Sequence, residues 1–115
     1  MRKMDIKIKS RIWIEADSRV LLGEGRVRLI KAIISTGSLS KAAAAVRMSY
    51  KKAWMLIDSI NKSSEKPVVV TTTGGKGGGG TQVTAYGKEL IKAFDNIKKD
   101  CWTHLDGQAH KIEKL

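Results

Sequence analysis

The chain has 115 residues, of which 42% are hydrophobic and 29% are charged, and a chain of this length has room for one domain with one modest core. Its 22 Lys and Arg against 11 Asp and Glu give a formal net charge of +11, which favours a polyanionic partner such as nucleic acid. Every apolar run is interrupted by a charged residue or by Ser, which argues against a membrane-spanning helix.

The N-terminus and the cysteine content predict a cytoplasmic protein. Met1-Arg2-Lys3 is followed by Asp5 and alternating lysines rather than by the apolar region of a secretory signal. A single cysteine, Cys101, cannot form an internal disulfide, which agrees with a reducing compartment.

Residues 5–15 alternate between apolar and polar side chains. Four isoleucines, at positions 6, 8, 12 and 14, are separated by charged residues and by Trp13. A period of two predicts a half-buried strand. A turn signal at residues 16–18 and the apolar run at residues 20–22 then complete a predicted N-terminal β-hairpin over residues 5–23.

Three helices are predicted over residues 25–63. Apolar residues recur at three- and four-residue spacings before Gly37, which can end the first helix in a left-handed conformation. Ser38 and Ser49 are suitable N-caps for a short second helix and for a third helix that runs to about residue 62. A sharp turn at Arg47-Met48 separates them, which is the outline of a helix-turn-helix.

A wing and a fourth helix complete the predicted fold. The β-branched residues 68–73 and the run 81–84 flank a glycine tract, so residues 68–84 read as a two-stranded wing. The fourth helix is predicted over residues 85–106, with Gly107 at its end. The fold class is therefore α+β: a single winged helix-turn-helix domain with an N-terminal β-hairpin and a long C-terminal dimerisation helix.

The second helix of a helix-turn-helix inserts its N-terminal side chains into the major groove of DNA. The predicted DNA-contacting residues are Ser38, Ser49, Tyr50, Lys51, Lys52, Trp54 and Met55, together with Lys76 in the glycine tract. Two alternatives remain at this level. The two helices could belong to an ordinary helical bundle, and Trp54 could pack beneath the wing rather than contact DNA.

The glycine tract satisfies a bare G-x-G-x-x-G pattern, but its context argues against a nucleotide site. A dinucleotide fingerprint opens a helix within a βαβ unit, and a phosphate-binding P-loop needs Ser or Thr directly after its Lys. Here Lys76 is followed by Gly77, and the tract leads into an extended segment. We expect a wing tip at which Lys76 approaches DNA phosphates.

Neither a metal site nor catalysis is predicted. Cys101, His104 and His110 are the candidate soft ligands, but a buried thiol beside surface histidines is the commoner arrangement. The sequence has no paired carboxylates and no activated nucleophile in a plausible arrangement. We therefore expect a protein that is not an enzyme and carries no cofactor.

One apolar stripe follows the fourth helix. Leu90, Phe94, Ile97, Cys101 and Leu105 advance in steps of three and four. The stripe extends past what a small domain can bury, which predicts the interface of a homodimer. The alternative is that it covers the core of its own chain.

The sequence resembles the N-terminal DNA-binding domain of the ModE family of molybdate-responsive transcription regulators, which is related to the LysR-type helix-turn-helix. The motifs that carry the resemblance are Gly37-Ser38-Leu39-Ser40 with Ala42-Ala43, Ser49-Tyr50-Lys51-Lys52-Ala53-Trp54, Thr73-Gly74-Gly75-Lys76 with the four glycines after it, and Thr84-Ala85-Tyr86-Gly87 with Leu90-Ile91. The resemblance implies a dimeric, sequence-specific regulator whose recognition helix begins at Ser49, Tyr50 and Lys51.

Two departures from that family shape the expectations. The resemblance does not extend to the C-terminal oxyanion-binding domains of such regulators, so molybdate is not expected as a ligand. Arg47 stands where the turn of relatives usually has Gly, and a left-handed conformation there would cost about 1 kcal/mol. Two rival functions remain: an interaction module that modulates a full-length regulator, and an oxyanion- or nucleotide-binding protein that uses the glycine tract.

Overall fold

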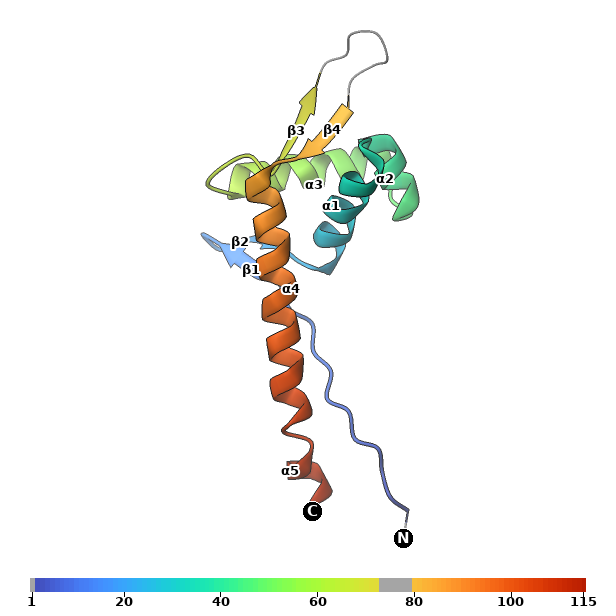
Figure 1. Ribbon diagram of the computed structural model, residues 1–115, viewed down its shortest axis with the longest axis vertical. Coiled ribbons are helices and arrows are strands. Elements are labelled where there is room, and N and C mark those ends of the chain that lie inside the picture. The colour runs from blue at the N-terminus through green and yellow to red at the C-terminus, as the bar shows by residue number, and fades with distance from the viewer. Residues whose placement is uncertain (1, 73–79) are drawn as a thin grey trace.

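The structure, a computed structural model, describes residues 2–72 and 80–115 and has an α+β fold (Figure 1). In chain order its elements are β1 (Ile14–Ala16), β2 (Arg19–Leu22), α1 (Glu24–Thr36), α2 (Leu39–Ala45), α3 (Tyr50–Ser63), β3 (Val69–Thr72), β4 (Gly80–Val83), α4 (Ala85–Asp106) and α5 (His110–Glu113). The strands form two separate antiparallel hairpins, β1-β2 and β3-β4. This arrangement of helices and hairpins is consistent with a winged helix-turn-helix.

The three helices between the hairpins form where the caps and the apolar spacing predict them. Gly37 adopts φ 68° and donates its N–H to the Ile33 carbonyl, which ends α1. The Ser38 hydroxyl caps α2 by accepting from the Lys41 N–H. The apolar faces of these helices supply much of the core, with Val27, Leu29, Ile30, Ile33, Leu39, Ala42, Ala43, Ala53, Ile57 and Ile60 all buried.

The wing and α4 extend from this core in opposite directions (Figure 1). β3 and β4 pair in register from Val69 opposite Val83 to Thr72 opposite Gly80. In Figure 1 the wing rises at one end of the molecule, and α4 leads away toward the other end, where α5 and both termini lie. The molecule is therefore elongated, with principal extents of 68 × 29 × 22 Å.

The predicted strand over residues 5–15 is wrong for most of its length. Only Ile14–Ala16 pair with β2, and residues 2–13 form no regular element. The alternation is nevertheless real, because Ile6, Ile8 and Ile12 are half-buried while Lys7, Lys9 and Arg11 are exposed. The segment runs beside α4 (Figure 1). An extended chain with one covered face has a period of two whether or not a second strand pairs with it.

The Val68 carbonyl is the junction between the wing and α4. It accepts the Thr84 N–H at 2.9 Å, and the Thr84 hydroxyl in turn caps α4 by accepting from the Gly87 N–H at 3.0 Å. The first turn of α4 thus lies directly against the start of β3. A Cβ atom on Gly87 would lie 2.5 Å from the Val68 carbonyl oxygen and 2.8 Å from Val83 Cγ1.

Replacing Gly87 by Ala is expected to lower the free energy of unfolding by about 2 kcal/mol, because the new methyl group overlaps backbone that cannot move without displacing the wing. Gly25→Ala is the matched control. No atom lies within 4 Å of the Cβ position at Gly25 in α1, so this change should leave stability unchanged or raise it by up to about 1 kcal/mol. Urea titrations of both variants make the comparison, and equal midpoints would contradict the tight junction.

Candidate nucleic-acid interface

The turn between α2 and α3 determines the direction in which α3 leaves the core. The Met48 N–H donates to the Ala43 carbonyl at 2.9 Å and the Arg47 N–H donates to the Ala44 carbonyl at 3.1 Å. These two bonds define a Schellman motif, whose penultimate residue is left-handed. Arg47 occupies that position with φ 58°, so the conformation that usually calls for Gly is present with an arginine.

A capped N-terminus begins α3 immediately after this turn. The Ser49 hydroxyl accepts the Lys52 N–H at 3.1 Å, which satisfies one of the free donors of the first turn. Ala53, Ile57 and Ile60 are buried on one face of α3. The helix therefore has a fixed orientation and a capped first turn.

The opposite face of α3 presents the residues predicted to contact DNA. Lys51 and Lys52 are exposed, and so are three larger side chains, Tyr50 at 57%, Trp54 at 53% and Met55 at 56%. Ser38 and Ser49 instead use their hydroxyls as caps, and Ser38 is half-buried. Lys76 lies outside the described residues, so the structure does not test its predicted role at the wing tip.

Asn61, near the end of α3, attaches the wing to this helix. Its Oδ1 accepts the backbone N–H groups of Val68 at 2.8 Å and Val69 at 3.2 Å, and its Nδ2 donates to the Val69 carbonyl at 2.9 Å. One side chain thus satisfies three backbone groups at the start of β3. The wing and α3 consequently form one rigid unit.

Thr81 attaches the wing to the start of α2. Its N–H donates to the Gly37 carbonyl at 3.0 Å, and its buried hydroxyl accepts the Leu39 N–H at 3.3 Å. Sequence reasoning assigned neither Asn61 nor Thr81 a role. Their partners are known only once the wing is folded against the helices, so no local signal identified them.

Trp54 lies on the wing side of α3. Together with Asp58, Asn61, Thr71 and Thr81 it lines a cavity of about 170 Å³ between the helix and the wing. A side chain that is 53% exposed is not a core residue. Trp54 thus lies beside the space between α3 and the wing, with about half of its side chain exposed.

A second groove of about 450 Å³ borders the other side of α3. Met55 and Leu56 contribute apolar surface to it, and Lys51, Lys52 and Arg26 line it as well. The Arg26 guanidinium donates to the Val20 carbonyl at 2.9 Å and to Ser59 Oγ at 3.2 Å, and its burial lowers its pKa from the usual value. The guanidinium stays protonated even so, because its ordinary pKa lies far above neutral pH. Sequence reasoning missed Arg26 because its partner Ser59 is 33 residues away.

The apolar stripe of α4 divides into a buried part and an exposed part. Phe94 is 1% exposed and packs in the core of its own chain, so its prediction as an interface residue is wrong. Leu90, Cys101 and Leu105 are half-buried, with Cys101 Sγ 3.9 Å from Ser10 Oγ. Ile97 is 48% exposed. The error arose because a helical stripe has the same spacing whether it packs on its own core or on a second chain.

Within residues 2–72 and 80–115, no group of three or more His, Cys, Asp or Glu side chains is arranged to hold a metal ion. No helix in these ranges is long and apolar enough to cross a membrane.

Comparison with known proteins gives several relatives. No family model matches the chain. It is 34% identical over 106 residues, 92% of its length, to the molybdenum transport protein ModE of Azotobacter vinelandii. It is 37% identical over 76% of its length to the transcriptional regulator ModE of Haemophilus influenzae, and 46% identical over 73% to the DNA-binding transcriptional dual regulator ModE of Escherichia coli K12. None of the three is described as an enzyme.

The match covers part of each relative. The chain spans 39% of the Azotobacter protein, 34% of the Haemophilus protein and 32% of the Escherichia protein. The activities of those whole proteins are therefore not transferred to this chain by similarity alone.

Replacing Arg47 by Gly is expected to raise the free energy of unfolding by about 1 kcal/mol, because Gly adopts φ 58° without a steric cost. Arg47→Ala also removes the arginine side chain but keeps a Cβ atom, and with it the steric cost of the left-handed conformation. It should therefore not stabilise the protein. Gly37→Ala introduces a Cβ at φ 68° and should destabilise by a similar amount. Urea unfolding measures all three, and equal stabilities of Arg47→Gly and Arg47→Ala would contradict the backbone explanation.

Proposed function

The chain belongs to the ModE family, and from that membership we propose that it is a winged helix-turn-helix regulator that binds double-stranded DNA with sequence preference. Two of the relatives named above are described as transcriptional regulators, which supports this proposal. The proposal concerns DNA binding by residues 1–115 as one domain and assigns no molybdate site to them.

The observation that carries the proposal is the exposed, capped N-terminal half of α3. Lys51 and Met55 lie one turn apart and both are exposed, beside the equally exposed Tyr50. A helix with its first turn free and its opposite face held by the core can enter the major groove, where a Lys hydrogen-bonds guanine and apolar groups contact the thymine methyl. Lys51 is the residue we assign to guanine.

The wing supplies the second part of the proposed contact. Its attachment through Asn61 and Thr81 holds it at a constant angle to α3, so the two elements approach DNA together. The positive charge of Lys76 suits a phosphate. We assign sequence preference to α3 and phosphate attraction to the wing.

The groove beside α3 suits the sugar-phosphate backbone. Lys52 and Arg26 provide cations that line it, and Leu56 provides apolar surface for the deoxyribose. Because Arg26 is already bonded to Val20 and Ser59, a phosphate would meet a guanidinium that is held in place. Arg26 therefore joins the proposed DNA-contacting residues.

We further propose that the protein acts as a homodimer through α4. Ile97 is 48% exposed, and α4 continues well beyond the core toward α5 (Figure 1). An exposed apolar side chain on a protruding helix gains free energy when a second copy covers it. A two-fold dimer would recognise a pseudo-palindromic DNA site.

Replacing Lys51 by Ala is expected to cost roughly 1 to 3 kcal/mol in affinity for a duplex selected from a random pool and much less for random DNA. Lys76→Ala should weaken both duplexes by similar, smaller factors. Binding isotherms at two salt concentrations measure the affinity for each duplex. The logarithm of the affinity should fall as the logarithm of the salt concentration rises, with a slope that corresponds to several neutralised phosphates.

Lys111→Ala, which removes one charge in α5, is the matched control and should change neither duplex's affinity appreciably. If Lys51→Ala weakened both duplexes equally while Lys76→Ala removed discrimination, the assignment of base reading to α3 would be wrong. A protein that bound every duplex alike would fit an interaction module rather than a sequence-specific regulator.

Replacing Ile97 by Glu is expected to convert the dimer to monomer, because a carboxylate would be buried without a partner in the interface. Phe94 is left unchanged because its loss would disrupt the core. Asn96→Glu, on an exposed and different side of α4, adds the same charge and should leave the dimer intact. Sedimentation velocity at micromolar concentration distinguishes the outcomes, and a monomeric parent protein would refute the proposal.

A further inference from the structure

The N-terminal segment has a strand edge that no described part of the chain uses. Residues 2–13 are extended beside α4, and within residues 2–72 and 80–115 the backbone of residues 5–12 makes no hydrogen bond. Ser10 Oγ lies 3.9 Å from Cys101 Sγ, which places one face of the segment against the helix. Each remaining backbone N–H and C=O group is therefore available to a strand that pairs alongside.

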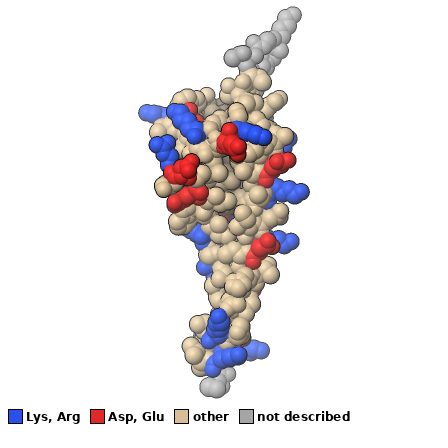
Figure 2. All heavy atoms as spheres, turned by 90° about the vertical axis from the view of Figure 1, so that its left-hand side faces the viewer, with Lys and Arg blue, Asp and Glu red and all other residues tan. Residues whose placement is uncertain are grey.

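The face of this segment that carries Lys7, Lys9 and Arg11 is strongly basic. Lys7, Lys9 and Arg11 are exposed and occupy successive positions on one side of the extended chain. Residues 2–13 hold five basic residues and one acidic residue, Asp5. Figure 2 views the molecule from the left of Figure 1, the side of α4 away from this segment, and that face carries both signs over the body and basic side chains without acidic ones at its lower end.

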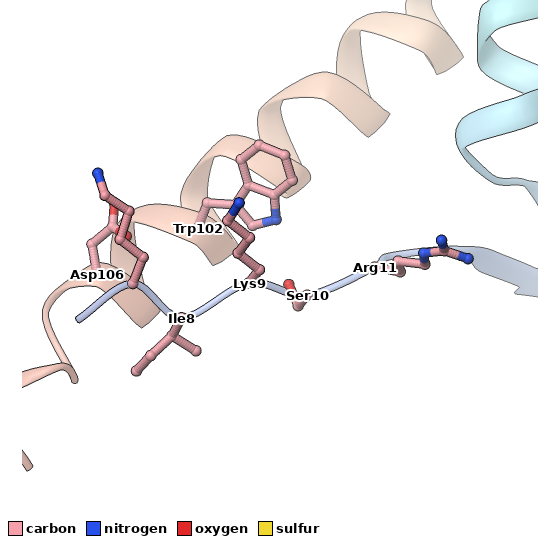
Figure 3. A pocket seen from close by; sticks show the side chains of 7 residues that line it. Ile8, Lys9, Ser10, Arg11, Trp102 and Asp106 are labelled. Atoms are coloured by element: carbon pink, nitrogen blue, oxygen red, sulfur yellow. The ribbon is translucent and has the colours of Figure 1, made fainter. Parts of the chain in front are cut away.

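A cavity of about 550 Å³ lies between this segment and the last turns of α4. Lys7, Lys9 and Arg11 line it together with Trp102 and Asp106, and Figure 3 shows the segment passing beside the helix that carries those two residues. Trp102 is 42% exposed, and Lys98 Nζ lies 4.8 Å from its ring centroid. The cavity therefore offers an aromatic surface and basic side chains, with Asp106 as its acidic lining residue.

These observations favour an acidic strand over a second copy of this segment. Antiparallel pairing of two copies about Lys9 would place Lys7 opposite Arg11 and each Lys9 opposite the other. Like charges directly opposite one another destabilise a pair of strands. The pairing could instead be centred on any other residue from 7 to 11. Every such register that keeps the isoleucines of both copies on one face still places at least two basic residues opposite each other.

The same observations favour a peptide over nucleic acid. The edge presents donors and acceptors in alternation, and a second peptide backbone supplies both, whereas phosphates only accept. The segment also lies at the end of the molecule opposite the wing (Figure 1). Its charge is thus remote from the surface proposed to contact DNA.

We propose that residues 5–12 bind an extended acidic peptide by strand addition, with Glu or Asp at alternate positions against Lys7, Lys9 and Arg11 and an apolar side chain on Trp102. The proposal is independent of DNA binding, because the two surfaces share no residue. It describes a contact by which another protein, or an acidic segment of one, could be recruited.

The probe is a short synthetic peptide that alternates Glu with Val, and its binding to the full chain is measured by calorimetry and by amide hydrogen exchange. The peptide should bind, and it should slow exchange at residues 6–12. The combined change Lys7→Gln, Lys9→Gln and Arg11→Gln should weaken binding by roughly tenfold. The control variant combines Arg2→Gln, Lys3→Gln and Lys114→Gln. It removes the same number of charges at positions outside residues 5–12 and should weaken peptide binding much less.

A peptide methylated on the backbone nitrogens that face the edge separates strand addition from charge attraction. It keeps every carboxylate, but its N-methyl groups prevent the two backbones from approaching each other, so it should not slow exchange at residues 6–12. Equal protection by the methylated peptide, by a DNA duplex, or by raising the concentration of the protein alone would overturn the proposal. The last result would mean that a second copy covers the edge.

Discussion

The peptide group that joins Val68 to Val69 holds the structure together at one place. The Asn61 side chain, near the end of α3, accepts the N–H groups of Val68 and Val69 and donates to the Val69 carbonyl. The Val68 carbonyl accepts the N–H of Thr84 at the start of α4. Gly87 allows α4 to approach this point, because a Cβ there would overlap the same carbonyl. The wing, the proposed recognition helix and the long C-terminal helix therefore share a single anchor.

This anchor explains how a small core can present two contact elements in a constant relation. Each hydrogen bond at the junction contributes about 1 kcal/mol on its own, but losing Asn61 would leave several backbone groups unpaired at once. Thr81 makes a comparable connection at the start of α2. Exposed ion pairs such as Lys31 with Asp95, 2.9 Å apart between α1 and α4, add little by comparison. The geometry of the proposed DNA surface rests on hydrogen bonds between side chains and the backbone, most of them partly buried, rather than on surface charge.

Local signals predicted the helical part of the fold well because caps act within one turn. Ser38 and Ser49 cap the helices that follow them, and Gly37 ends α1. Arg47 has the left-handed conformation that the sequence analysis considered for the turn. Long-range relations were less accessible. The alternation of residues 5–15 could not distinguish a paired strand from an extended segment on a helix, and the stripe containing Phe94 could not distinguish core from interface. Arg26 and Ser59 meet only after α1 and α3 have packed, so no spacing in the sequence pointed to that groove.

The rigid joint at Gly87 also gives α4 a mechanical property. A helix of 22 residues is about 33 Å long, and its first turn cannot slide against β3. Gly87, Ile91 and Phe94 are buried along the first three turns of α4, so the core holds this part of the helix and prevents it from pivoting about its first turn. The remaining residues, 95–106, extend about 18 Å further. The length of α4 thus keeps Trp102 at a fixed distance from the proposed DNA surface.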